Sequence, residues 1–94
     1  MTDAANPVTD NVARHRYELI EHGLTAFADY RLRAGLIEIP HVETPVAARG
    51  GGMAGRLMEG LVEHVRARRL KIVPICPYAA AWLKRHPEHA DVVA

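Results

Sequence analysis

The segment RGGGMAGRL, residues 49–57, places four of the seven glycines of the chain within six positions. A pattern typical of a helix follows at once, so the glycines stand where we expect a helix to begin. Backbone N–H groups at such an end point toward one spot, and the helix dipole adds partial positive charge. Because glycine has no side chain, a bulky anion can reach these groups. The segment therefore favours binding of a phosphate or pyrophosphate group.

Two common nucleotide-binding loops fit the segment poorly. The GxGxxG pattern of dinucleotide-binding folds is satisfied from Gly50 to Gly55, but the residues TPVAAR separate these glycines from the preceding strand. The acidic residue expected about 20 positions further on is missing, because the next apolar strand ends in CP. A Walker A loop needs lysine followed by serine or threonine, whereas Gly55 is followed by RL. A purely structural role accounts well for one glycine, but it explains a cluster of four at a helix start poorly.

Further side chains that are suited to catalysis or binding lie near the C-terminus. Cys76 is the only cysteine, and it is either a nucleophile at a helix start or a small core residue. Tyr78 offers a phenol that donates a proton or packs. Lys84 and Arg85 either bind phosphates or complement the C-terminus of the last helix. The histidines show no metal-ligand spacing with Cys76, so no metal site is predicted.

The first half of the chain predicts the strands that position some of these residues. Residues 16–20, 24–33 and 36–45 predict three strands joined by short turns, which is an antiparallel meander. Pro40 lies inside the third strand and cannot donate a ladder hydrogen bond, so an edge, a bend or a bulge is expected there. Residues 1–11 predict a flexible N-terminal tail, and residues 12–94 predict a single domain.

The second half of the chain predicts helices around one more strand. Apolar residues from Met53 to Val65 recur at spacings of three and four, as in an amphipathic helix whose arginines at 56, 66, 68 and 69 form a solvated face. Residues 71–76 predict a strand buried on both faces. Pro77 opens a last helix that Pro87 closes. A right-handed crossover sets strand 71–76 parallel to the third strand, which makes the fold class α+β.

Composition narrows the class of protein. The formal net charge is +1, which is too balanced to indicate nucleic-acid or membrane binding. A single cysteine fits a reducing compartment, and no apolar run approaches the length of a membrane span, so a cytoplasmic protein is expected. The open edge of the meander allows a monomer or a weak homodimer.

The segment from Arg49 to Ala54 matches the Arg/Gln-x-x-Gly-x-Gly/Ala signature of the GNAT superfamily of N-acetyltransferases. With HVETP before it and CPYAAAWLKRHPEHADVV after it, the chain resembles the short, YjdJ-type members from Tyr17 to Val93. Two departures stand out: Gly51 replaces a residue that is often basic or polar, and the elements that hold the acceptor in longer members are missing.

The resemblance implies a minimal acyl-CoA N-acyltransferase fold that uses acetyl-CoA to acetylate an amine. The residues that it implies for coenzyme binding lie on the third strand, in the glycine loop and on the last helix: Val42, Thr44, Arg49, Gly50, Gly51, Gly52, Met53, Ala54, Cys76, Tyr78, Lys84 and Arg85. The thioester carbonyl is expected to meet a backbone amide near Val42.

Acetyl transfer to an amine also requires a base. His41 and Glu43 lie two apart, so a regular strand would place both on one face beside Ile39, where either takes the ammonium proton or is merely structural. Cys76 is a third catalytic candidate, as an acetyl-accepting nucleophile. The acceptor amine, a small molecule or a protein amine, is not identified. The alternative function is a coenzyme A or acyl-CoA binding module with little or no catalysis.

Overall fold

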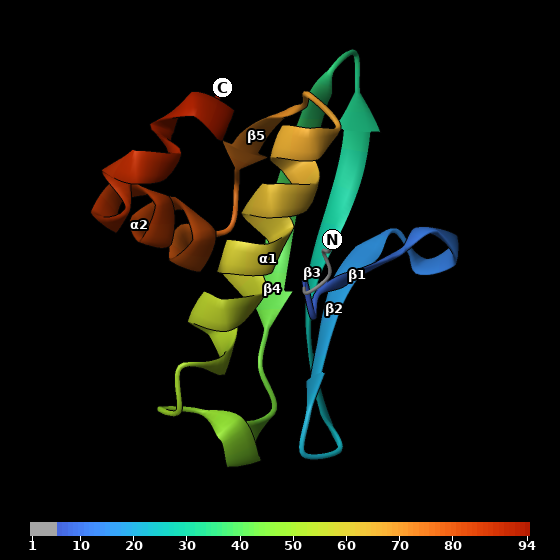
Figure 1. Ribbon diagram of the computed structural model, residues 1–94, viewed down its shortest axis with the longest axis vertical. Coiled ribbons are helices and arrows are strands. Elements are labelled where there is room, and N and C mark those ends of the chain that lie inside the picture. Colours follow the sequence, from blue (N-terminus) through green and yellow to red (C-terminus); the bar gives the residue numbers. More distant parts are fainter. Residues whose placement is uncertain (1–5) are drawn as a thin grey trace.

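The computed structural model describes residues 6–94 as a five-stranded sheet with two α-helices (Figure 1). The strands are β1 (Thr9–Asn11), β2 (Arg16–Glu21), β3 (Leu24–Arg33), β4 (Leu36–Glu43) and β5 (Lys71–Pro74). The helices are α1 (Met53–Ala67) and α2 (Pro77–Arg85), with three short 3₁₀ segments, η1 (Val12–Arg14), η2 (Val46–Ala48) and η3 (Pro87–Val92).

The sheet has the order β1-β2-β3-β4-β5. β1 to β4 are antiparallel neighbours in succession, and β5 pairs with β4 in parallel. The predicted meander, the crossover through α1 and the α+β class are therefore confirmed. The meander has four strands rather than three, because the short β1 precedes the first strand that the sequence predicts.

One face of the sheet carries the hydrophobic core. Alternate residues of the strands, among them Leu19, Ala28 and Ile37, are inaccessible to solvent and pack with the apolar stripe of α1. Ala79, Trp82 and Leu83 of α2 join the same core, so both helices cover the same face (Figure 1).

The prediction of a strand buried on both faces over residues 71–76 is wrong in two respects. Ile72 is buried but its neighbour Lys71 is exposed, because α1 and α2 both lie on the other face of the sheet. The strand ends at Pro74, and the chain then turns toward α2. Cys76 lies two residues beyond the strand, although its N–H still bonds the carbonyl oxygen of Ile39 at 2.8 Å.

The predicted N-terminal tail is wrong for the part of it that the structure describes, and residues 1–5 lie outside that part. Val8 is only 1% exposed and belongs to the core. The side-chain amide of Asn6 donates to the carbonyl oxygen of Gly60 in α1, at 3.0 Å. A Cβ atom on Gly60 would lie 2.6 Å from Val8 Cβ, so the glycine admits this segment against the helix. The domain therefore begins before residue 12.

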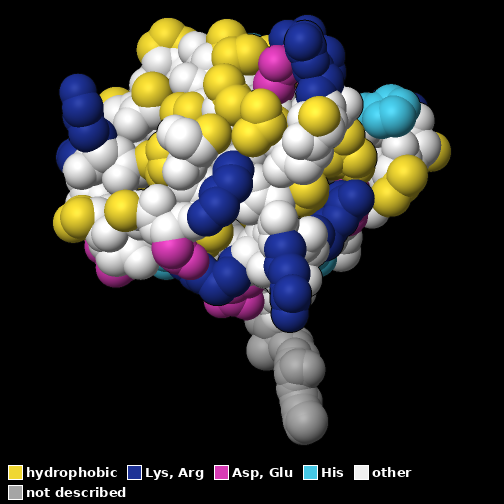
Figure 2. Space-filling view, turned by 90° about the horizontal axis from the view of Figure 1, so that it is seen from above, with side chains coloured by type: hydrophobic (Ala, Val, Ile, Leu, Met, Phe, Trp, Pro, Cys, Tyr) yellow, Lys and Arg dark blue, Asp and Glu magenta, His cyan; other side chains and the backbone are white. Residues whose placement is uncertain are grey.

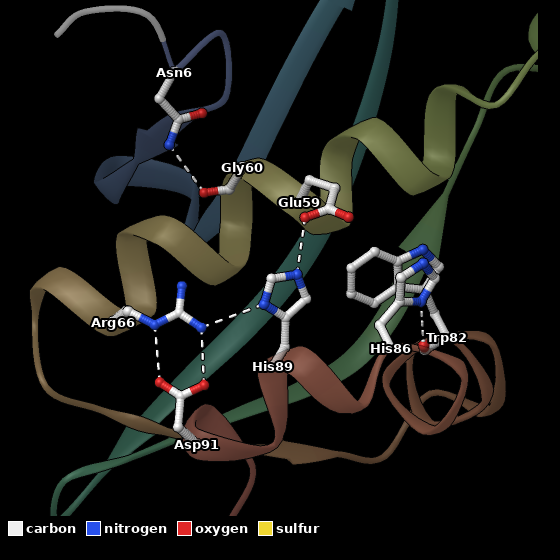
Figure 3. A network of polar contacts seen from close by, with 8 residues as sticks. All are labelled: Asn6, Glu59, Gly60, Arg66, Trp82, His86, His89 and Asp91. Atoms are coloured by element: carbon white, nitrogen blue, oxygen red, sulfur yellow. Dashed lines mark hydrogen bonds and ion pairs between the residues drawn. The ribbon is translucent and has the colours of Figure 1, made fainter. Parts of the chain in front are cut away.

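The C-terminal segment is tied to α1 by polar contacts (Figure 3). Arg66 donates to both carboxylate oxygens of Asp91, at 2.8 and 2.9 Å, and to Nδ1 of His89 at 3.3 Å. The other ring nitrogen of His89 lies 2.9 Å from a carboxylate oxygen of Glu59. Ligand atoms of Glu59, Glu88 and His89 lie within 4.8 Å of one another, a grouping that the sequence spacing did not predict.

The predicted solvated arginine face is confirmed, because the arginines at 56, 66, 68 and 69 are all exposed. Arg56, Arg66 and Arg68 each form an ion pair, with Glu21, Asp91 and Asp10 respectively.

The end of the molecule where the β3–β4 hairpin turns shows basic side chains bordering hydrophobic ones (Figure 2). Leu32 and Leu36 are exposed there. Among the described residues, no helix is long and apolar enough to cross a membrane.

Candidate active site

A cleft of about 560 Å³ opens where β4 ends, at the end of the molecule opposite the β3–β4 hairpin. It lies between the last residues of β4, the loop that leads into α1, and the first turn of α2. The lining residues are His41, Val42, Glu43, Thr44, Ala48, Arg49, Gly50, Gly52, Met53, Ala54, Gly55 and Tyr78. The loop that leads into α1 is in the lower part of Figure 1.

The cleft exists because β5 stops short of the end of β4. The pairing of these two strands runs only to Ile39 and Pro74. Beyond this point β4 continues to Glu43 with β3 on one side and, in the described part of the chain, no strand on the other. Backbone groups of residues 40–43 that point away from β3 are therefore available to a ligand.

A β-bulge in β4 decides which face its polar residues occupy. The register moves from Asp29↔His41 to Arg31↔Glu38, so two residues of β4 oppose the single Tyr30 of β3. The irregularity lies next to Pro40, as the proline predicts. It reverses the alternation, and His41 is placed opposite Asp29 on the face away from α1 and α2.

His41 and Glu43 share one face, as predicted, but they do not lie beside Ile39. Ile39 is buried beneath the helices, whereas both polar side chains are about half exposed on the other face. The prediction assumed a regular strand, and the extra residue of the bulge overturns it. Because both residues also line the cleft, the free edge of β4 connects the two faces of the sheet at this point.

The two side chains form a hydrogen-bonded pair. His41 Nε2 lies 2.8 Å from Glu43 Oε1. An ionised carboxylate only accepts hydrogen bonds, so Nε2 must carry a proton and donate it. In the neutral ring the proton is then absent from Nδ1, which leaves that nitrogen as an acceptor. The arrangement is that of a base held by a carboxylate.

The glycine loop exposes backbone N–H groups to the cleft. Gly50 and Gly52 have φ of 86° and 83°, a conformation that residues with side chains rarely adopt. Gly52 is the N-cap residue of α1, and it makes no side-chain hydrogen bond to the N–H groups of the first turn. The amides of residues 53–55 are therefore without intrahelical partners, and all three residues line the cleft. A Cβ atom at Gly50 would meet nothing within 4 Å, so the space beside it is open.

Two arginines lie at the glycine loop: Arg56 holds the loop in place, and Arg49 faces the cleft. Arg56 donates to both carboxylate oxygens of Glu21 at 2.8 and 2.7 Å, and to the carbonyl oxygen of Gly51 at 3.0 Å. The hydrogen bond from Arg56 holds the pKa of Glu21 below its usual value. Arg49 lines the cleft and has no ion-pair partner among the described residues. The role of Arg56 was not predictable from local sequence, because its partner Glu21 lies 35 positions away.

Most of the residues that the sequence predicts for the site come together in this cleft. They are His41, Val42, Glu43, Thr44, Arg49, Gly50, Gly52, Met53, Ala54 and Tyr78. Ala48 and Gly55 were missed, although Gly55 completes the glycine pattern and stands in the first turn of α1.

Four predicted residues do not line the cleft: Gly51, Cys76, Lys84 and Arg85. Cys76 is 7% exposed and belongs to the hydrophobic core. Lys84 and Arg85 are exposed in the last turn of α2. Burial raises the pKa of Tyr78, and the charge of Arg85 opposes that rise. The phenol consequently stays protonated and able to donate.

Comparison with known proteins relates the chain to a sequence family and to a solved structure. The sequence model of the GCN5-related N-acetyltransferase family matches residues 16–92. The fold is similar to the solution structure of a GCN5-like protein from Staphylococcus aureus, with a TM-score of 0.68 and 23% identity. The similarity covers 97% of this chain and 91% of that one.

Proposed function

The chain belongs to the GCN5-related N-acetyltransferase family, and we propose that it transfers the acetyl group of acetyl-CoA directly to a primary amine. The observation that carries this proposal is the N-terminus of α1, which has no side-chain cap from Gly52 and faces a cleft beside the free edge of β4. An anion site and backbone groups of β4 beyond its pairing with β5 would then lie next to the histidine–carboxylate pair.

The residues at the loop fit a pyrophosphate group. The amides of residues 53–55 converge at a helix end, where the dipole favours negative charge. The space beside Gly50 is open, so a pyrophosphate group can approach the loop there. Arg49 is available for a charge-assisted hydrogen bond. Lys84 and Arg85 are assigned to the more distant phosphate of the adenosine end.

The pantetheine arm of the coenzyme is assigned to the gap between β4 and β5. Val42 and Thr44 offer backbone groups along this gap, and Tyr78 lies across it on α2. Bound acetyl-CoA supplies a thioester whose carbonyl carbon bonds to the amine nitrogen and whose sulfur leaves with the electron pair of the broken bond.

The chain itself handles the protons and the developing charge. His41 Nδ1 takes a proton from the acceptor ammonium, and Glu43 stabilises the imidazolium ring that results. A backbone N–H near Val42 donates to the oxygen on which negative charge develops. The Tyr78 phenol, whose pKa burial raises, donates its proton to the departing sulfur, and the second proton that the nitrogen loses on forming the amide restores the phenol.

Direct attack is preferred to an acetylated Cys76. The thiol is in the core, and Cys76 is absent from the cleft lining. A buried cysteine without an adjacent cation or base is a poor nucleophile. The pair of His41 and Glu43 favours an enzyme over a binding module without catalysis, because a simple coenzyme site has no need of a base. A cytoplasmic location and a monomeric or weakly dimeric state stay predictions.

Calorimetric titration with acetyl-CoA tests this function. Saturable binding to the folded protein is expected, and the release of free thiol should then depend on an added amine. A protein that is folded by circular dichroism yet binds no acetyl-CoA contradicts the proposal. Binding without thiol release, across alkyl amines and basic peptides, would leave only the coenzyme-binding module.

A further inference from the structure

Asp29 lies in the middle of the sheet face that α1 and α2 leave bare. We call this the open face; it carries the side chains of Arg16, Glu18, Phe27, Asp29, Glu38, His41 and Glu43. The strand register sets Asp29 directly between Arg16 of β2 and His41 of β4. Residues opposed in this way have Cβ atoms about 4.5–5.5 Å apart. The carboxylate of Asp29 is therefore a neighbour of the proposed base.

Asp29 differs from the other acidic residues of the open face in having no partner. Glu18 accepts from Arg16 at 2.6 Å, Glu38 from Arg31 at 3.1 Å, and Glu43 pairs with His41 at 2.8 Å. Within residues 6–94, Asp29 makes no side-chain hydrogen bond or ion pair, although it is partly buried. A carboxylate that is partly removed from water without a partner is suited to a cationic ligand.

Arg16 is the cation that lies opposite Asp29 in the strand register, but its side chain contacts other residues. Arg16 bonds Glu18, and its guanidinium carbon lies 4.3 Å from the centre of the Phe27 ring. Phe27 lies opposite Glu43, with its ring centre 6.1 Å from that of His41. An apolar surface thus adjoins the carboxylate, beside the pair that lines the cleft.

We propose that Asp29 binds the ammonium group of the acceptor, and that the acceptor is a primary alkyl amine reaching the cleft across the open face. This inference rests on the proposed acetyltransferase function and names its substrate class. Asp29 holds the ammonium next to His41, while the alkyl chain lies against Phe27. Amines that carry a neighbouring carboxylate are disfavoured, because Asp29 and Glu43 would repel it.

A titration of the wild-type protein followed by ¹H–¹⁵N NMR tests the binding site without requiring turnover. The probes are 1,5-diaminopentane, Nα-acetyl-lysine methylamide and, as the uncharged control, 1-pentanol. Both amines should shift amide signals of residues 27–29 and 41–43, and pentanol should not. The two amines distinguish a free diamine from a lysine side chain. Shifts elsewhere, equal shifts with pentanol, or no binding of either amine overturn the inference.

Asp29→Asn supplies the decisive variant, because it removes the charge and keeps the shape. The apparent Kd for the amines should rise about tenfold or more, the loss expected for one charge-assisted hydrogen bond. The KM for the amine should rise likewise, while the affinity for acetyl-CoA stays unchanged. Glu38→Gln is the matched control: it lies on the same face but is paired with arginines, and it should bind amines like the wild type.

The outcomes separate this inference from the proposed function. Intact acetyl-CoA binding together with an Asp29→Asn variant that binds amines normally rejects the role of Asp29 alone. An equal loss in Glu38→Gln would also reject it, because the effect would then be one of overall charge. Failure to bind acetyl-CoA rejects the proposed function, whatever the amine titration gives.

Discussion

Arg56 of α1 and Glu21 of β2 are joined by two parallel hydrogen bonds, of 2.8 and 2.7 Å. The same guanidinium donates to the carbonyl oxygen of Gly51 at 3.0 Å. One side chain thus fastens the glycine loop to the β2–β3 hairpin. Exposed ion pairs add little to stability, so the effect of this contact lies in the position of the loop.

Arg56→Met is therefore expected to weaken acetyl-CoA binding more than it weakens the fold. Methionine keeps the apolar stem but frees the loop, and the affinity should fall about five- to tenfold, the cost of a less well organised site. Thermal unfolding should change little. Arg66→Met removes a similar two-point ion pair far from the cleft and serves as the control. Equal affinities in the two variants would argue against the role of Arg56.

Two neighbouring glycines should respond differently to alanine. Gly52 has φ of 83°, so Gly52→Ala should cost about 1–2 kcal/mol in folding free energy and weaken coenzyme binding. Gly51 has no positive φ, and a Cβ atom there would lie 3.4 Å from the Ala48 carbonyl oxygen, an ordinary contact. Gly51→Ala should resemble the wild type in chemical denaturation and calorimetry. A wild-type affinity in both variants would remove the loop from the coenzyme site.

The catalytic roles predict unequal rates of thiol release. His41→Gln should lower kcat by about 10²–10⁴-fold, the usual contribution of a general base. Glu43→Gln should cost less, because the ring nitrogen remains. Cys76→Ala should keep most of the rate, since the thiol is in the core. A Cys76→Ala variant as slow as His41→Gln would instead indicate an acetylated cysteine.

The periodic part of the fold was predictable from the sequence because burial leaves a pattern. Alternation identified β3, the three- and four-residue spacing identified α1, and the crossover fixed the parallel strand. The glycines located the cleft, since Gly50 and Gly52 do adopt positive φ. Local composition carried that information without knowledge of any contact.

The remainder depends on contacts that no local pattern records. β1 has only three residues and no apolar alternation, so it resembled a tail. The proline indicated a bulge, but its consequence, the reversed face of His41, required the register with β3. Glu21 and Arg56 are brought together only by the folded chain. In each case the structure differs from the prediction because tertiary contacts prevail over the local preference of the sequence.

Gly60→Ala should destabilise the protein even though alanine favours helices. The propensity gain of about 1 kcal/mol is outweighed, because the new Cβ would lie 2.5 Å from Asn6 Oδ1 and 2.6 Å from Val8 Cβ. Overpacking of this kind costs about 1–3 kcal/mol. Gly55→Ala is the control within α1, since its Cβ would lie 3.5 Å from Trp82 Nε1, an ordinary distance. Denaturant unfolding of the two variants should show opposite signs.

The pair of Arg66 and Asp91 should make part of the stability dependent on acid (Figure 3). The hydrogen bond from Arg66 lowers the pKa of Asp91 from 3.8 to about 2. A carboxyl group whose pKa is lower in the folded state favours folding above its unfolded pKa. That contribution is lost as the pH falls through the folded value. The relevant window thus runs from about pH 4 down to about pH 2.

Thermal unfolding of the wild type and Asp91→Asn between pH 6 and pH 2 measures this contribution. The wild type should have the higher Tm at pH 6, and the difference should shrink below about pH 4 as the aspartate takes up its proton. Because the side chains are exposed, the difference at pH 6 should be small and should decrease further in high salt. In the Asp91→Asn background, Arg66→Met should add no further acid dependence. A difference that stays constant from pH 6 to pH 2 would mean that packing, not charge, ties the C-terminal segment to α1.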